Sequence, residues 1–276
     1  MRWSKLALSA ALMTPCGCFF LNQQEEQRSL RSIFDTPINA TDRVILDYRL
    51  IDQPAGDPFA VDQLWNMVTC PLSHERESLL AENGIRIGVV SGVIPPEFID
   101  RVTSDRHVIE PRAFATKAGE EKIIPVNGPF EKVTTKVIRE LASPPDSLDV
   151  KDGESGWAVQ ATPTDGGRLR FHCCPIVQSG MKQAWLRPTA DRTQFKWEQS
   201  KVKDKLDTLA FDVTLGPGEY LVIGSTSQPG GTLGELLFFV AEPARVRQRF
   251  LVLRGRSEVG SPDAKSSIAA KAHESR

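Results

Sequence analysis

The chain has 276 residues, of which 40% are hydrophobic and 25% are charged, and its formal net charge is −1. This balance is typical of a globular protein with room for one large domain or two small ones. The near-zero net charge creates no global field for nucleic acid, and the 7% aromatic content gives little support to a carbohydrate-binding platform.

The first eighteen residues have the three-part layout of an export signal. Arg2 and Lys5 are positive, residues 6–13 (LALSAALM) are apolar, and residues 14–18 (TPCGC) form an exit of mostly small residues. Secretory signals have this order. We therefore predict that residues 1–18 are a signal peptide and that the mature protein lies outside the cytoplasm.

The last residues of this segment, Gly17 and Cys18, are a small residue followed by a cysteine. They resemble the signal of bacterial lipoproteins, although Pro15 and Cys16 depart from the residues which that family prefers. The resemblance implies lipidation of Cys18 and an anchor in the cell envelope, at the periplasmic face or the outer membrane. Ordinary cleavage followed by secretion, and an uncleaved signal anchor, are the alternatives.

Residues 19–41 are polar and weakly patterned, which predicts a tether before the folded part. A mixed α+β unit is predicted over residues 42–141, beginning with a strand at 44–51 that alternates between two faces. The other elements expected in this unit are a helix over 59–68, a helix capped by Ser73 and stopped at Asn83-Gly84, a strand over 85–89 and a short helix from Pro95-Pro96.

From Val108 onward, the residue pattern indicates β-strands. The dipeptide Asn127-Gly128 lies between two alternating runs and predicts a hairpin, whose turn Pro129 lengthens. Residues 142–156 (ASPPDSLDVKDGESG) are rich in Pro, Gly, Ser and Asp. They are predicted as a linker or as a long loop inside one domain.

A predominantly antiparallel β unit is predicted over residues 157–257, and residues 258–276 are predicted as a disordered tail. Hairpin turns are expected at 165–167 (DGG) and 216–218 (GPG). The expected strands are 157–162, 169–173, 181–188, 195–197, 209–215, 219–223, 236–240 and 249–253. The fold class is thus α+β, a small mixed α/β unit followed by a β unit, with a shared sheet system left open. The sequence does not assign Trp157, Trp185 and Trp197 to core or surface.

Three of the five cysteines lie beyond the signal: Cys70, Cys173 and Cys174. An odd number argues against a disulfide framework, so we expect three small buried side chains. A disulfide between Cys70 and either Cys173 or Cys174 is the alternative. His172 and the two adjacent cysteines are the one cluster of potential metal ligands, but no CxxC or HxxxH partner is present. We expect an exposed His172 and no metal or cofactor.

Three further motifs predict ordinary structure. Residues 74–77 (HERE) lack the second His of a zinc protease, and no GxSxG nucleophile motif is present. Residues 229–234 (PGGTLG) lack the Lys of a phosphate-binding loop and predict a flexible turn. Arg245, Arg247 and Arg249 alternate along a strand and predict a solvated basic face, with an anionic partner as the alternative.

Three phrases stand out in the β-rich part, namely PIV at 175–177, GEYLVIG at 218–224 and LGELLF at 233–238. Together they give the segment 157–239 a resemblance to the C-terminal β-domain of outer-membrane secretins. The resemblance implies a soluble module associated with an envelope complex. It does not imply a closed pore, because no clear pair of lipid-facing strands is present.

Since no catalytic motif is found, we predict a non-enzymatic, envelope-located binding or scaffold protein that recognises its partner through β edges and loops. The expected partners are the membrane, through the lipid on Cys18, and an envelope protein, but no nucleic acid. The alternatives are a subunit or accessory protein of an envelope export complex, and an extracytoplasmic hydrolase without a linear motif. A pocket in which His107 or His172 meets an acid would favour the hydrolase.

Overall fold

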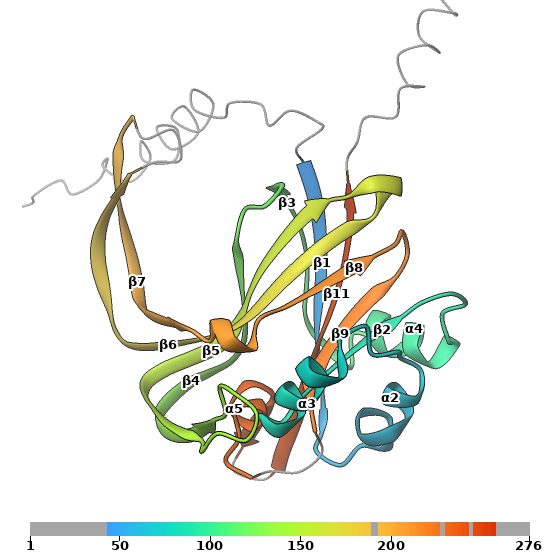
Figure 1. Cartoon of the computed structure of the whole chain (residues 1–276), viewed down its shortest axis with the longest axis horizontal. Helices are drawn as coiled ribbons and strands as arrows, with labels where there is room; N and C mark the ends of the chain where they lie inside the picture. The colour runs from blue at the N-terminus through green and yellow to red at the C-terminus, as the bar shows by residue number, and fades with distance from the viewer. Residues whose placement is uncertain (1–42, 189–192, 227–229, 243–244, 258–276) are drawn as a thin grey trace, which may run out of the picture. The chain divides into compact units, whose positions relative to one another are not determined.

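Two antiparallel β-sheets dominate the computed structural model, which describes residues 43–188, 193–226, 230–242 and 245–257 (Figure 1). The first sheet has the strand order β2-β9-β11-β1-β3, with β10 paired to β11, and the second has the order β4-β5-β6-β7, with β8 paired to β6. The described residues belong to one compact unit. The predicted α+β fold, dominated by antiparallel strands, is confirmed.

The first sheet consists of β1 (Arg43–Pro54), β2 (Ile85–Val90), β3 (Val108–Lys117), β9 (Tyr220–Ser225), β10 (Phe239–Glu242) and β11 (Arg245–Ser257). The second sheet consists of β4 (Lys122–Val137), β5 (Asp146–Pro163), β6 (Leu169–Pro188), β7 (Phe195–Lys205) and β8 (Phe211–Leu215). The helices are α2 (Leu64–Asn66), α3 (His74–Glu82), α4 (Pro96–Thr103) and α5 (Leu233–Phe238), with a π-helical turn at Phe59–Gln63 and 3₁₀ turns at Asp165–Gly167 and Asp207–Leu209.

Both predicted units contribute strands to the first sheet. β1, β2 and β3 come from residues 42–141, and β9, β10 and β11 come from residues 157–257. β1 pairs with β11 over its length, from Val44 opposite Ser257 to Pro54 opposite Arg247. The sheet therefore follows the alternative in which the two parts of the chain share one sheet system.

The predicted linker or long loop at 142–156 is wrong from Asp146 onward, because β5 begins there. Leu148 and Val150 turn toward the core while Asp149 and Lys151 stay exposed. The polar composition that indicated a loop is thus the solvent-facing side of a strand.

The local signals in the first part of the chain predict most of its elements. Along β1, Val44, Leu46, Tyr48 and Leu50 are buried on one face, as the alternation predicts. Ser73 caps α3 by accepting a hydrogen bond from the Arg76 amide. The helix predicted over 59–68 is instead a π-helical turn followed by the three-residue α2.

The hairpin predicted at Asn127-Gly128 is wrong. The two flanking runs form one long strand, β4, and both pair with β5, from Lys122 opposite Val159 to Val137 opposite Asp146. The register shifts around Asn127, so the residues that suggested a turn form a β-bulge. The Asn127 amide donates hydrogen bonds to carbonyls of α5 and β10 instead of closing a turn.

Two further predictions fail near residues 209–240. β8 and β9 flank the predicted turn at 216–218, but β8 belongs to the second sheet and β9 to the first, so they form no hairpin. The strand predicted at 236–240 is α5 up to Phe238. Thr232 accepts from the Glu235 amide and Glu235 accepts from the amides of residues 230 and 231, which caps the start of this helix.

The main hydrophobic core has Trp157 near its centre, with the ring 5.8 Å from Phe211 and 6.5 Å from Phe238. A second cluster packs α2 and α4 against the first sheet through Trp65, Phe98 and their neighbours. Among the described helices, none combines the length and apolar character that crossing a bilayer would require.

Candidate functional site

The predicted lipidation residue, Cys18, lies outside the described residues. The same is true of the whole signal peptide at 1–18, of the tether at 19–41 and of the tail at 258–276. In the described part of the chain, the main features are an exposed β-ribbon and a buried ionic cluster.

The exposed ribbon is the outer part of β6 and β7, residues 179–188 and 195–202, which we call the arm. Pairing between β5 and β6 extends only from Pro163–Leu169 to Glu154–Gln178. Beyond Gln178, β6 pairs with β7 alone, from Ser179 opposite Val202 to Pro188 opposite Phe195, with a register shift before Gln183. Figure 1 shows this ribbon extending beyond both sheets.

Large apolar side chains are concentrated on the arm. Five of the nine exposed large hydrophobic residues in the described chain lie there: Met181 (82% exposed), Leu186 (53%), Phe195 (66%), Trp197 (73%) and Val202 (51%). Leu186 lies directly opposite Trp197, and Phe195 is two residues from Trp197. These three side chains therefore share one face of the ribbon.

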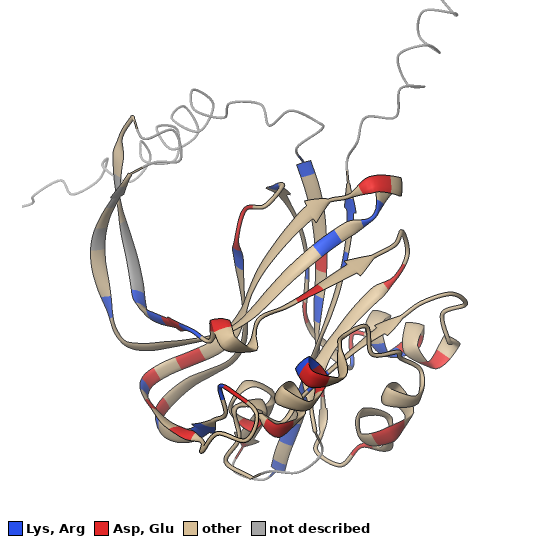
Figure 2. Cartoon of the chain, viewed as in Figure 1, with Lys and Arg blue, Asp and Glu red and all other residues tan. Residues whose placement is uncertain are grey.

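Ion pairs hold the base of the arm to the rest of the second sheet. Lys201 Nζ lies 2.8 Å from Glu154 Oε1 on β5, and Lys205 pairs with Glu121 beside β4. Basic residues are visible where β7 joins the sheet (Figure 2). The arm is thus fixed at its root, while its apolar face is left without a partner in the described structure.

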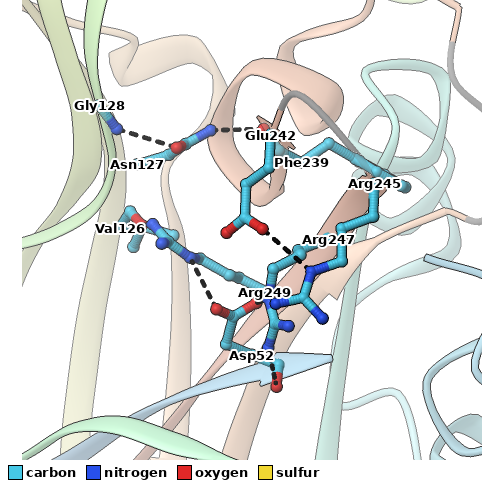
Figure 3. A network of polar contacts seen from close by, with 9 residues as sticks. All are labelled: Asp52, Val126, Asn127, Gly128, Phe239, Glu242, Arg245, Arg247 and Arg249. Atoms are coloured by element: carbon cyan, nitrogen blue, oxygen red, sulfur yellow. Dashed lines mark hydrogen bonds and ion pairs between the residues drawn. The ribbon is translucent and has the colours of Figure 1, made fainter. Parts of the chain in front are cut away.

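The basic stripe on β11 does not have the predicted solvated character. Arg247 Nε donates to Asp52 Oδ1 at 2.9 Å, and Arg249 Nε lies 4.0 Å from Asp52 Oδ2 (Figure 3). The side chain of Asp52 is only 8% exposed, and those of the two arginines are 15% and 18% exposed. Only Arg245 is a surface residue, paired with Glu242 at 3.1 Å. The prediction is wrong because it could not include Asp52, a distant residue that draws two arginines inward.

This ionic cluster also links the two sheets. Asp52 lies on β1, Arg249 lies on β11, and Arg249 donates to the carbonyl of Val126 on β4 at 2.8 Å. In Figure 3, Asn127 extends from the same bulge toward Phe239. The cluster therefore connects the two sheets through Arg249.

His172 and the two cysteines that follow it, the potential metal ligands of the sequence, face different surroundings. Cys173 and Cys174 are both buried, and burial raises the pKa of the Cys174 thiol to about 12. His172 is about half exposed, and its Nδ1 lies 3.2 Å from Asp212 Oδ1. In the described residues, no group of three or more His, Cys, Asp or Glu residues could hold a metal ion.

Asp212 is the centre of a small surface network. Burial alone would raise its pKa, but hydrogen bonds from Arg170 and His172 outweigh that effect and lower it. His172 and Asp212 are not among the residues that line the cavities beside β2, α3, α4, α5 and β4. His107 lies beside Arg101, with 3.5 Å between ring and guanidinium nitrogens. In those five cavities of the described structure, neither histidine meets an acid.

Cys70 departs from the prediction, because its side chain is exposed rather than buried. Cys70, Cys173 and Cys174 are all free thiols, so the bridge that the sequence left open is not formed. Trp157 lies in the core and Trp197 on the surface of the arm. The side chain of Trp185 is among those not described.

Comparison with known proteins gives little further information. No model of a known protein family matches the chain, and no curated protein does. The secretin-domain β-barrel of InvG, from the Salmonella SPI-1 injectisome, is 12% identical, with 92% of this chain and 73% of that chain covered and a TM-score of 0.24. The type II secretin GspD of enteropathogenic Escherichia coli is 11% identical, with 92% and 81% covered and a TM-score of 0.26. At these values the likeness assigns neither a family nor an activity to this chain.

Proposed function

We propose that this chain is a non-enzymatic binding protein of the cell envelope that docks to a protein partner through the apolar face of its arm. The observation that supports the proposal is the group formed by Leu186, Phe195 and Trp197 on a ribbon that leaves the body of the protein. Contiguous exposed apolar patches usually mark interaction sites, and Trp and Phe are enriched in protein interfaces.

The magnitudes agree with a docking role. Complete burial of a large apolar side chain contributes about 1.5–3 kcal/mol. The three side chains of the apolar face would therefore contribute about 5–9 kcal/mol. This is comparable with the cost of about 4–15 kcal/mol for lost freedom on association. The apolar face can thus offset much of that cost, with further contacts setting the affinity.

The location follows from the predicted signal peptide and its candidate lipid acceptor. A lipid on Cys18 would hold the chain at a membrane, and residues 19–41 would let the folded part stand away from it. An export complex of the envelope is one assembly in which a docking protein of this kind would act.

Site-specific photo-crosslinking in intact cells of the source organism tests the arm. A benzophenone amino acid replaces Trp197 in one variant and Val93 in a control, because Val93 is 95% exposed but lies off the arm. We expect an adduct with one protein from position 197 and none from position 93. The Phe195→Ser substitution should reduce that adduct by about tenfold, since it removes a neighbouring anchor.

Two outcomes would contradict the proposal. The first is adducts of the position-197 probe with lipid alone, which would make the arm a membrane-contacting element. The second is equal adduct yields at positions 197 and 93, which would mean that the arm has no selective partner.

A further inference from the structure

A groove of about 450 Å³ lies between β4 on one side and α5 and β10 on the other. The apolar residues that line it are Phe130, Val133, Leu236, Phe239, Val240 and Val246. The side chain of Val246 is 47% exposed, and both phenylalanines are only partly buried. A volume of this size is in the range of ligand pockets, so the groove can receive large side chains.

Hydrogen bonds join the walls of the groove at both ends of its β4 side. At one end, the side-chain amide of Asn127 donates to two carbonyls of the opposite wall, at 3.0 and 2.7 Å. At the other end, the Thr135 hydroxyl and the Lys136 amide both donate to the carbonyl of Gly231, at 3.0 and 2.8 Å. The spacing of the walls is therefore fixed before anything binds, which lowers the entropic cost of filling the groove.

The charges of the arm favour this groove over a second arm as its contact. The sequence of the arm has four basic residues and one acidic residue: Lys182, Arg187, Lys196, Lys201 and Glu198. Lys201 pairs with Glu154, and the other four residues leave a formal charge of +2. Two arms would thus repel each other. Among the described residues that line the groove, the one charged residue is Glu235, whose charge is opposite to that of the arm.

The arm cannot fill the groove of its own copy. Its root is fixed by ion pairs to Glu154 and Glu121, and it extends away from α5 (Figure 1). No residue of the arm lines the groove. Each copy therefore has an apolar projection and an apolar groove that it cannot cover itself. A contact between two copies covers one surface of each kind, whereas an unrelated partner for the arm leaves the groove exposed.

We propose that the partner of the arm is a second copy of this chain, whose groove receives the apolar face of the arm. The inference rests on the docking role proposed above and names the partner. Phe195 and Trp197 of one copy pack against Phe130 and Val246 of the next. Because different surfaces meet, each dimer keeps one free arm and one free groove, and larger assemblies form by repeating the same contact.

A complementation experiment distinguishes this contact from any symmetric one. Trp197→Ser removes the largest described side chain of the arm's apolar face, and Val246→Lys places a charge in the groove that repels the basic arm. Sedimentation velocity of the purified full chain gives the size of the species for each variant and for their equimolar mixture. Val93→Lys is the control, because Val93 is 95% exposed and lies on neither surface.

We expect the unaltered chain and Val93→Lys to form dimers and larger species as the protein concentration rises. Trp197→Ser and Val246→Lys should each associate about tenfold more weakly, or less, when alone. Their equimolar mixture should form dimers and nothing larger. The first variant supplies an intact groove and the second an intact arm, so only one productive contact is possible.

The proposal is overturned if the unaltered chain stays monomeric at its highest soluble concentration, or if Val246→Lys alone associates like the unaltered chain. A benzophenone amino acid at position 197 of the purified chain is a check that does not depend on the folding of Val246→Lys. Its adduct should map to the peptide that contains Val246, and an adduct within the arm would contradict the proposal. A monomeric chain whose arm is crosslinked to another protein in cells would overturn this inference and leave the docking role intact.

Discussion

The buried carboxylate of Asp52 binds the side chains of two arginines. Its oxygens lie within ion-pair distance of Arg247 and Arg249, and Arg247 also donates to the backbone carbonyl of Asp52 at 3.2 Å. Neutralising the carboxylate leaves two poorly solvated guanidinium groups close together. Removal of one partner from a buried ion pair is far more damaging than loss of a surface pair.

We predict that Asp52→Asn lowers the free energy of unfolding by about 3 kcal/mol, since it leaves the two arginines uncompensated. Urea denaturation followed by circular dichroism measures this change. Asp105→Asn is the control, because Asp105 is exposed, and it should change stability by less than about 0.5 kcal/mol. A loss below about 1 kcal/mol for Asp52→Asn would show that the cluster is well solvated.

At the residue scale, the sequence predicts which side chains alternate along a strand better than it predicts whether they are buried. The alternation of Arg245, Arg247 and Arg249 along a strand is confirmed. Their burial could not be predicted, because the carboxylate that draws in two of them is 195 residues away in the chain. The exposure of the arm could not be predicted for a related reason. Short strands with apolar residues usually lie in a core, and nothing in their sequence indicates that they form an exposed ribbon.

At the scale of elements, the close contact between α5 and the end of α3 depends on a glycine. The Gly234 amide donates to the carbonyl of Asn83 at 2.8 Å. A Cβ added to Gly234 would lie 2.0 Å from the carbonyl oxygen of Gly84, which is backbone and cannot rotate away. Asn83 in turn exchanges side-chain hydrogen bonds with the backbone of Ile138, so this contact also involves the end of β4.

We predict that Gly234→Ala destabilises the protein by about 2 kcal/mol, because overpacking outweighs the gain of about 1 kcal/mol in helix propensity. Thermal unfolding monitored by calorimetry measures the difference. Gly230→Ala is the matched control, since its added Cβ would meet nothing closer than 3.9 Å. Equal melting temperatures for the two variants would mean that α5 can move away from Gly84 without loss.

The elements that sequence reasoning predicted correctly are those with a local stop or start signal. Ser73 before α3, and Pro96 as the first residue of α4, are examples. The prediction of a hairpin at Asn127-Gly128 is wrong because the runs before and after this dipeptide both pair with β5, which outweighs the turn propensity of the two residues. The same happened at 216–218, where each flanking strand found its partners in a different sheet. The helix α5 had a usable signal in Thr232 and Glu235, which form the spacing of a capping box.

At the scale of the molecule, the order of strands in space differs from their order in the chain. The first sheet combines strands from the beginning and the end of the described sequence, and its longest pairing joins β1 to β11. Local periodicity predicts that such strands exist, but it contains no information about distant partners. The fold class could therefore be predicted, whereas the pairing of strands could not.

We predict that Cys18→Ala moves the protein from the membrane fraction to the soluble fraction, because the proposed anchor needs this thiol for its lipid. Fractionation of cells followed by immunoblotting measures the distribution. Cys16→Ala serves as the control and should leave it unchanged. Equal membrane retention of both variants would exclude a lipid on Cys18 as the anchor.

The pairing of Val44 with Ser257 brings the two ends of the described chain to the same end of one strand pair. A short peptide bridge would join them, and new termini could be opened in the exposed turn at Asp165–Gly167, where added atoms meet no neighbours. Such a circular permutant would retain every strand pair while it reverses the order of the two halves during synthesis. If this permutant folds, the fold does not depend on β1 being synthesised first.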